Sequence, residues 1–223
     1  KSPKKENHQH PIKPLEEKKG FFDFNNFKLQ ALVLVIIGFV IYSNSINNEY
    51  ALDDGIVIQG NEYVQQGFKG IKKILTKDAY DSFYQQMGAS QQLAGGRYRP
   101  LSIVTFAIEQ AVFGTDENAK TAMDIAPIRH FFNVVFYIIS IVILLYFLKF
   151  YIFQKNQGIA FVVSLLFMVH PIHTEVIANA KSRDEIISFL FIILTFIYAL
   201  NYRETKKTSH LVWGLVFYFL ACL

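Results

Sequence analysis

Two adjacent carboxylates stand just beyond the first long apolar run of the chain. Asp53 and Asp54 lie in the stretch ALDDGIVI, about seven residues after that run ends. Two carboxylates that share one site favour proton uptake by one of them, which suits a general base for a hydroxyl nucleophile. The structural alternative is an Asx turn closed by Gly55, because Asp and Gly both favour turns. The sequence leaves both interpretations open.

A second group of ionisable residues follows the apolar stretch that ends at Val169. Twelve helical residues rise roughly 18 Å, which predicts that His170 lies in the outer part of a bilayer. Polar groups at that depth are costly, so His170, His173 and Glu175 are functional candidates. Pro171 predicts a kink between the two histidines. Zinc binding has little support because no motif spacing is present, and a polar cluster that fixes helix packing is the structural alternative.

Cations form the third candidate group. In the stretch SRDE, Ser182 and Glu185 have the spacing of a capping box before a long apolar helix. Arg183 does not fit a cap, since a cation at a helix N-terminus needs an anion to balance it. Glu175 or the phosphate of a ligand could supply that anion, and helix N-termini attract phosphate.

The stretch GGRYRPL adds two further cations to this group. Arg97 and Arg99 flank Tyr98 within it. A phosphate seat is one interpretation of these arginines, and side chains that extend to lipid headgroups are the other.

The elements that must position these residues are apolar runs. The chain of 223 residues is 52% hydrophobic and contains 22 Phe and 12 Tyr, with its charges gathered in short polar stretches. Apolar helical runs of about 20 residues can cross a hydrocarbon layer of roughly 30 Å. We therefore predict an all-α polytopic membrane protein. Its expected spans are 29–46, 128–150, 157–180 with a kinked external end, 186–202, and 210–223 as the start of a further span.

The distribution of basic residues predicts the topology. Residues 1–28 carry seven lysines, which indicates a cytoplasmic tail, and 203–207 (RETKK) follows as a second cytoplasmic marker. Residues 47–127 then form a long external loop. The net charge of +4 therefore indicates orientation in a membrane and not nucleic-acid binding.

The external loop is expected to fold. Apolar residues between 101 and 112 predict a helix on the membrane surface or against the spans, and residues 64–75 predict a weaker helix. Residues 82–96 have the polar, Gly-rich composition of a mobile segment. The single cysteine, Cys222, excludes an intrachain disulfide.

Four motifs in this order resemble one family. They are LDDGIVIQGN, RYRPLSIVTFAIEQAVFG, PIRHFFNVVFYI and HPIHTEVIANAKSRDEI, which together cover roughly residues 40–190. The set resembles the membrane part of the transmembrane and tetratricopeptide-repeat O-mannosyltransferases and their bacterial relatives, in the GT-C glycosyltransferase class. The resemblance implies the amino-terminal part of a GT-C fold with a long, partly helical first external loop.

The resemblance also implies a reaction and roles for the residues above. It implies transfer of a sugar, mannose among the candidates, from a polyprenyl phosphate to a Ser or Thr hydroxyl of an acceptor protein. Asp53 and Asp54 would be catalytic. The donor phosphate would be held by Arg99, His170, His173 and Arg183, with support from Glu175, Arg97 and Tyr98. No metal ligand is assigned, and the resemblance leaves dependence on a divalent metal undecided.

Two rival functions remain at this stage. One is a non-catalytic scaffold subunit of a larger membrane complex. The other is a lipid or solute transporter in which His170, Glu175 and Arg183 line a path across the bilayer. Abundant Lys, Asn, Ile and Phe favour a bacterial inner membrane over the endoplasmic reticulum as the location.

Overall fold

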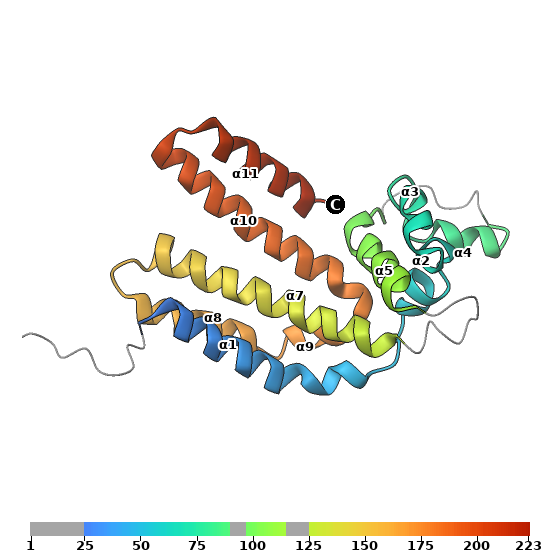
Figure 1. Ribbon diagram of the computed structural model, residues 1–223, viewed down its shortest axis with the longest axis horizontal. Coiled ribbons are helices and arrows are strands. Elements are labelled where there is room, and N and C mark those ends of the chain that lie inside the picture. The colour runs from blue at the N-terminus through green and yellow to red at the C-terminus, as the bar shows by residue number, and fades with distance from the viewer. Residues whose placement is uncertain (1–24, 90–96, 115–124) are drawn as a thin grey trace, which may run out of the picture.

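The computed structural model describes residues 25–89, 97–114 and 125–223, and within these ranges the regular structure is helical, with no strand. The all-α fold predicted from the sequence is confirmed. Figure 1 shows long helices side by side in a bundle, with a group of short helices at one end of it. Most of the basic segment 1–28 and residues 90–96 of the segment predicted to be mobile lie outside the described residues.

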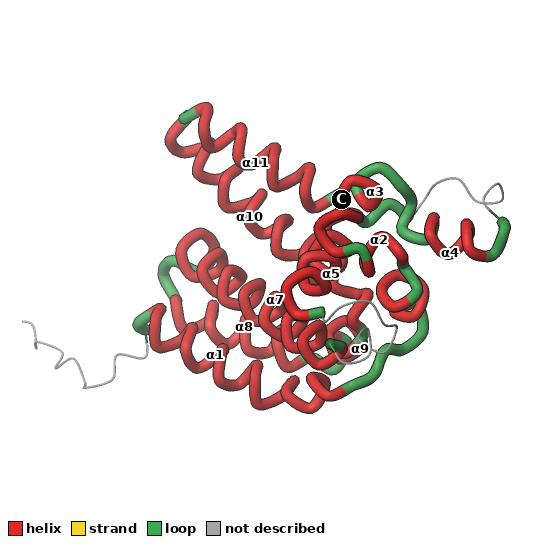
Figure 2. Tube along the Cα trace, turned by 45° about the vertical axis from the view of Figure 1, so that its right-hand side comes forward, coloured by secondary structure: helices red, strands yellow, loops and turns green. Residues whose placement is uncertain are grey.

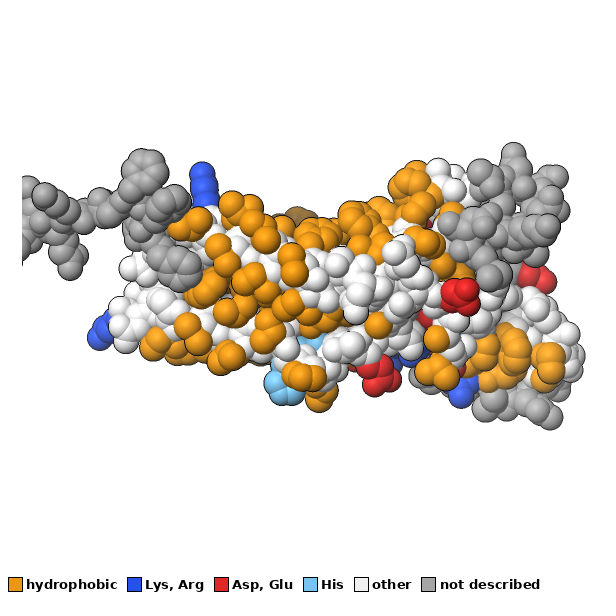
Figure 3. Space-filling view, turned by 90° about the horizontal axis from the view of Figure 1, so that it is seen from below, with side chains coloured by type: hydrophobic (Ala, Val, Ile, Leu, Met, Phe, Trp, Pro, Cys, Tyr) orange, Lys and Arg blue, Asp and Glu red, His pale blue; other side chains and the backbone are white. Residues whose placement is uncertain are grey.

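The bundle is built from five helices that run between its two ends. They are α1 (Phe27–Tyr42), α7 (Ala126–Phe147), α8 (Gln157–Val169), α10 (Arg183–Thr205) and α11 (Thr208–Ala221). Among the described residues, three segments are long and apolar enough to cross a membrane, and these are Phe27–Asn47, Ala126–Ile152 and Ala180–Thr205. The first two continue their α-helices through η1 (Ser43–Asn47) and η4 (Leu148–Ile152). The side of the bundle in Figure 3 is mostly hydrophobic, with charged side chains toward its ends.

Close packing joins α1, α7 and α8. A Cβ atom on Gly38 of α1 would lie 2.8 Å from Cγ1 of Ile138 on α7, so only glycine allows the two helices to approach this closely. Tyr42 and Tyr137 both donate hydrogen bonds to the carbonyl oxygen of Met168, at 2.7 and 3.1 Å. Those bonds satisfy one of the free carbonyls in the last turn of α8.

The third predicted span is divided into two helices. Helix α8 ends at Val169 and α9 (His173–Ala178) begins after a short turn that contains Pro171. Proline lacks the amide hydrogen and disfavours helical geometry in the residue before it, which explains the break. The turn brings the following segment, η5 (Ala180–Ser182), to the start of α10.

The short helices form a cap over one end of the bundle. The cap contains η2 (Gly55–Gln59), α2 (Glu62–Gln65), η3 (Gly67–Gly70), α3 (Ile71–Ile74), α4 (Asp81–Gln86) and α5 (Pro100–Phe113). Helix α5 confirms the helix predicted at 101–112, whereas the weaker helix predicted at 64–75 is divided into α2, η3 and α3. Phe106 and Ile58, both fully buried, lie in a second hydrophobic core, separate from that of the bundle. Figure 2 shows the loop that leads from the end of the α1 segment into this cap.

A buried lysine holds the opposite end of the bundle together. Lys149 is 2% exposed, and its Nζ donates to the carbonyl oxygen of Asn25 at 2.5 Å and to Oε1 of Gln30 at 2.8 Å. These bonds connect η4 to the start of α1. The ammonium group of Lys149 therefore bonds inside the protein and is not exposed at the surface.

Candidate functional site

A pocket of about 830 Å³ opens between the cap and the start of α10. Its charged lining comes from three separate segments: Asp53, Arg97, Arg99, Lys181, Asp184 and Glu185. Apolar side chains of α10, Phe189 and Ile192 among them, line another part of the same pocket. The pocket therefore offers acids, cations and an apolar wall to a single ligand.

Asp53 is the member of the aspartate pair that lines this pocket. Its side chain is partly exposed, and its carboxylate accepts a hydrogen bond from the hydroxyl of Tyr80. Burial, followed by this bond and the negative charge of Asp53, raises the pKa of Tyr80 to about 12. The guanidinium of Arg97 lies 4.6 Å from the centre of the Tyr80 ring and donates to the Tyr84 hydroxyl at 2.6 Å. Asp53 is thus oriented by the cap.

Asp54 has a different environment from its neighbour. It is fully buried and does not line the pocket. Its Oδ1 accepts from the backbone amide of Lys181 at 2.7 Å, and its Oδ2 accepts from the amide of Ala51 at 3.1 Å. The carboxylate of Asp54 is thus turned to the backbone of η5 and away from the pocket, and its catalytic role stays a prediction.

Asp184 connects the two nearest cations at the floor of the pocket. Nε of Arg99 lies 3.4 Å from Oδ2 of Asp184, and Nζ of Lys181 lies 4.0 Å from the same oxygen. The side chains of Arg99 and Lys181 remain 50% and 31% exposed, so both can reach a ligand. Sequence reasoning missed Lys181, although its place three residues before Asp184 was a usable signal.

Arg183 is not a pocket residue. Its side chain is fully buried, and its guanidinium donates to Oε1 of Glu109 at 2.5 Å and to Oδ1 of Asn133 at 2.6 Å. It also lies 4.0 Å from the centre of the Phe106 ring. The structure does not bring Arg183 together with Arg99 in the pocket, and its role in binding the donor phosphate stays a prediction. The anion that balances it is Glu109, on the cap helix α5, and not the exposed Glu175.

A second buried arginine completes this network. Arg129 of α7 is 0% exposed, and its Nη2 donates to Gln110 at 2.8 Å while its Nη1 bonds to the Tyr50 hydroxyl at 2.5 Å. Its Nε lies 3.8 Å from Oε2 of Glu109. Two arginines of the bundle thus hold one carboxylate of the cap, which fixes how α5 sits on α7 and α10.

The predicted capping box at the start of α10 is wrong. Ser182 occupies the N-cap position but its side chain makes no capping hydrogen bond. The preceding turn is instead held through the amide of Lys181, which is bonded by Asp54 and by Oδ1 of Asn179 at 3.2 Å. The carboxylate of Asp54, distant in sequence, therefore holds the turn before α10, where the sequence predicted a local cap by Ser182.

The two histidines lie away from the pocket. His170 and His173 line a separate hollow with mostly apolar neighbours on α8 and the turn after it. His170 is exposed, and its Nδ1 accepts from the amide of Ile172 at 3.3 Å. The structure does not bring these histidines together with Arg99, and their role in binding the donor phosphate stays a prediction. In the parts of the chain that the structure describes, no group of three or more His, Cys, Asp or Glu could hold a metal ion.

Tyr98 has a supporting position next to the pocket. Its hydroxyl donates to the carbonyl oxygen of Leu75 at 2.7 Å. That bond ties α3 to the residues that lead into α5. Tyr98 therefore fixes the segment that carries Arg97 and Arg99, and it does not line the pocket.

The fold and this site define a class: an all-α polytopic membrane protein with a charged pocket under a folded cap. Human protein O-mannosyl-transferase TMTC1 is 31% identical to the chain over 156 residues, which are 70% of the chain and 16% of that protein. Human protein O-mannosyl-transferase TMTC3 is 26% identical over 191 residues, which are 84% of the chain and 18% of that protein. No family model and no solved structure matches.

Over most of its length the chain is homologous to the TMTC protein O-mannosyl-transferases, the family that the four sequence motifs predicted. It spans about a sixth of the length of these two relatives. The relatives with this name come from human, mouse and a nematode. The expectation of a bacterial membrane finds no support among them and stays a prediction.

Proposed function

We propose that this chain is the part of a membrane glycosyltransferase that binds a lipid-linked sugar phosphate and activates a protein hydroxyl. The observation that carries the proposal is one pocket that combines Asp53, the cations Arg97, Arg99 and Lys181, and an apolar wall on α10. The name of these relatives, protein O-mannosyl-transferase, supports mannose as the sugar and protein as the acceptor. The cap end would then face the extracytoplasmic side.

Each lining group has a role in this reaction. Asp53 accepts the proton of a Ser or Thr hydroxyl, and the hydroxyl oxygen forms a bond to the anomeric carbon of the sugar. The bond between that carbon and the phosphate oxygen breaks, and its electron pair leaves on the phosphate. Arg99 and Lys181 stabilise the resulting negative charge. The apolar wall at Phe189 and Ile192 suits the first part of a polyprenyl chain.

No observation specifically favours either rival function, the transporter or the scaffold subunit. A transport path through His170, Glu175 and Arg183 would need these side chains in one continuous channel. His170 and Glu175 are exposed, whereas Arg183 is fully buried in an ion pair with Glu109. A scaffold subunit would not require an acid and three cations around one pocket.

The test is sugar transfer by the complete protein in detergent, with a polyprenyl-phosphate mannose donor and a protein acceptor. Asp53→Asn removes the base and is expected to lower the rate by about 100-fold or more. Lys181→Gln is expected to raise the donor KM by about tenfold with a smaller effect on kcat. Full activity in Asp53→Asn, with normal expression and thermal stability, would favour the scaffold function.

A further inference from the structure

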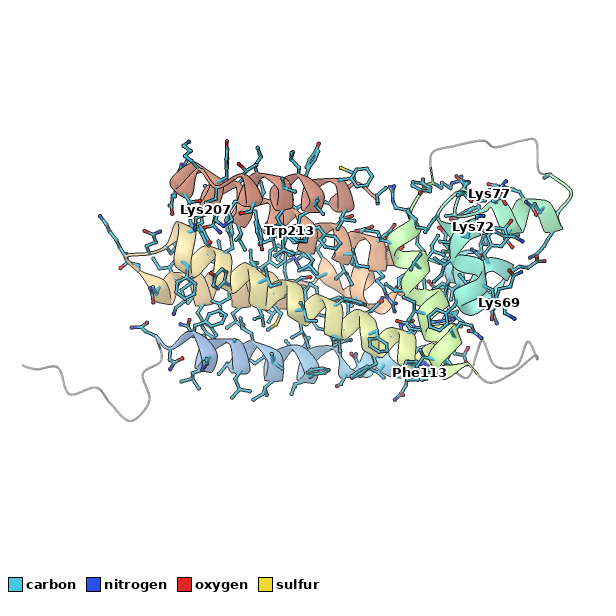
Figure 4. All side chains as sticks on the ribbon, turned by 45° about the horizontal axis from the view of Figure 1, so that its top comes forward. Lys69, Lys72, Lys77, Phe113, Lys207 and Trp213 are labelled. Atoms are coloured by element: carbon cyan, nitrogen blue, oxygen red, sulfur yellow. The ribbon has the colours of Figure 1, made fainter. Side chains whose placement is uncertain are left out.

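A strongly basic face covers the cap next to the pocket. Residues 67–77 contain four lysines and no acidic residue. Six of the exposed side chains of this segment form what we call the lysine face: Phe68, Lys69, Lys72, Lys73, Leu75 and Lys77. Figure 4 places Lys69, Lys72 and Lys77 on the cap, at the opposite end of the molecule from Lys207.

Two glycines fix the turn that displays Phe68 and Lys69. Gly67 has φ +58°, and a Cβ atom there would lie 3.0 Å from Cβ of Ala111 on α5. At Gly70 a Cβ atom would lie 1.8 Å from the carbonyl oxygen of Tyr63. Both glycines are buried, yet the Phe68 between them is 60% exposed. The turn therefore holds an aromatic side chain in solvent by its backbone geometry.

The charge of the lysine face is largely unbalanced. Lys77 lies 3.9 Å from Asp81 in an exposed pair, and Lys73 lies 4.9 Å from the centre of the Tyr63 ring. Within the described residues, Lys69 and Lys72 have no ion-pair partner. Such a surface attracts anions, and its exposed Phe68 and Leu75 add apolar anchors.

The face lies on the side of the cap that is turned away from the membrane helices. Segments η3 and α3 pack on α5, and α5 in turn packs on α7 and α10. Helix α5 thus separates the lysine face from the bundle, and Figure 1 shows α2 and α4 beyond α5 at the end of the molecule. This position favours a partner in the aqueous phase over lipid headgroups.

The lysine face is also continuous with the pocket. Asp78 follows Lys77 directly, and its carboxylate accepts from the amide of Tyr80 at 2.9 Å and from the amide of Arg97 at 3.2 Å. Tyr80 and Arg97 are pocket residues. A chain bound along residues 69–77 would therefore reach the pocket that contains Asp53.

We propose that the lysine face binds an acidic, extended segment of the acceptor polypeptide and brings its hydroxyl to the pocket. Delivery of the acceptor hydroxyl to the pocket rests on the proposed function, whereas binding of the acidic segment does not. Acceptor selection would then depend on Asp and Glu near the modified Ser or Thr. Phe68 and Leu75 would contact apolar side chains of the same segment.

The test is binding of a fluorescein-labelled peptide of Glu, Ser and Gly to the complete protein in nanodiscs of neutral lipid, followed by fluorescence anisotropy. Lys69→Gln with Lys72→Gln is expected to weaken binding by about threefold to tenfold, since exposed ion pairs are individually weak. The matched control is Lys155→Gln with Lys207→Gln, which removes two exposed cations distant from the cap and should leave binding unchanged. A peptide with Gln in place of Glu should bind weakly to every variant.

Three results would overturn the proposal. The first is that the unaltered protein fails to bind the acidic peptide, and the second is that both double variants weaken peptide binding equally. The third is that Lys69→Gln with Lys72→Gln weakens peptide binding only in nanodiscs that contain anionic lipid. The last result would assign the lysine face to headgroups. Asp53→Asn separates this proposal from the proposed function. That variant should lose transfer and still bind the acidic peptide with unchanged affinity.

Discussion

Oδ1 of Asp54 accepts a hydrogen bond from the backbone amide of Lys181 at 2.7 Å, across 127 residues of sequence. The bond joins the first loop of the cap to the turn that starts α10. It places Asp53, the preceding residue in the chain, in the lining of the pocket together with Lys181 and Asp184. Asp54 therefore acts as a positioning residue, and Asp53 as the proposed base.

Asp54→Asn is expected to destabilise the protein by about 1–3 kcal/mol, because one oxygen becomes an amide that faces a backbone donor in a buried site. Asp53→Asn is the control and should change stability by less than about 0.5 kcal/mol, since this side chain is partly exposed. Thermal unfolding in detergent measures both variants. Equal stability of the two would remove the structural role assigned to Asp54.

Glu109→Gln is expected to lower the free energy of unfolding by about 3–5 kcal/mol, because it leaves the buried Arg183 and Arg129 without their shared anion. Glu175→Gln is a matched change at an exposed carboxylate and should be neutral. Resistance to unfolding by SDS distinguishes them. If Glu109→Gln and Glu175→Gln behave alike, the network does not hold the cap on the bundle.

Tyr80→Phe tests the surroundings of the Tyr80 hydroxyl, which is partly buried and lies beside Asp53, through alkaline pH. The folded pKa of Tyr80 is raised from 10.0 to about 12, so its protonated hydroxyl stabilises the fold fully below pH 10, and this contribution is lost as pH rises through about 12. The variant should therefore lose less stability over that interval than the unaltered protein. Phenolate absorbance during alkaline titration should show one fewer late-titrating tyrosine. Identical titration curves would contradict the raised pKa of Tyr80 and the burial of its hydroxyl beside Asp53.

Gly70→Ala is expected to disrupt the cap, since its Cβ atom would meet the Tyr63 carbonyl oxygen at 1.8 Å and backbone cannot move aside at low cost. Overpacking of this kind costs about 1–3 kcal/mol. Gly158→Ala provides the comparison, because nothing lies within 4 Å of a Cβ atom there. Limited proteolysis should cleave the cap faster in Gly70→Ala alone.

The sequence by itself determined the elements of this protein. Long apolar runs between short charged stretches predicted the helices of the bundle, and Pro171 predicted the break after α8. The order of four motifs predicted the family. These properties depend on local composition and on spacing along the chain, which can be read without knowing what packs against what.

Only the tertiary structure decided which of the candidate residues share a site. Arg183 pairs with Glu109, 74 residues away, and Asp54 caps a turn 127 residues away, so neither is available to a ligand in the pocket. Lys181 reaches the pocket because that same turn is held in place. A buried charge must find its counterpart among whatever side chains folding brings near it, and that choice is set by how α5, α7 and α10 pack together.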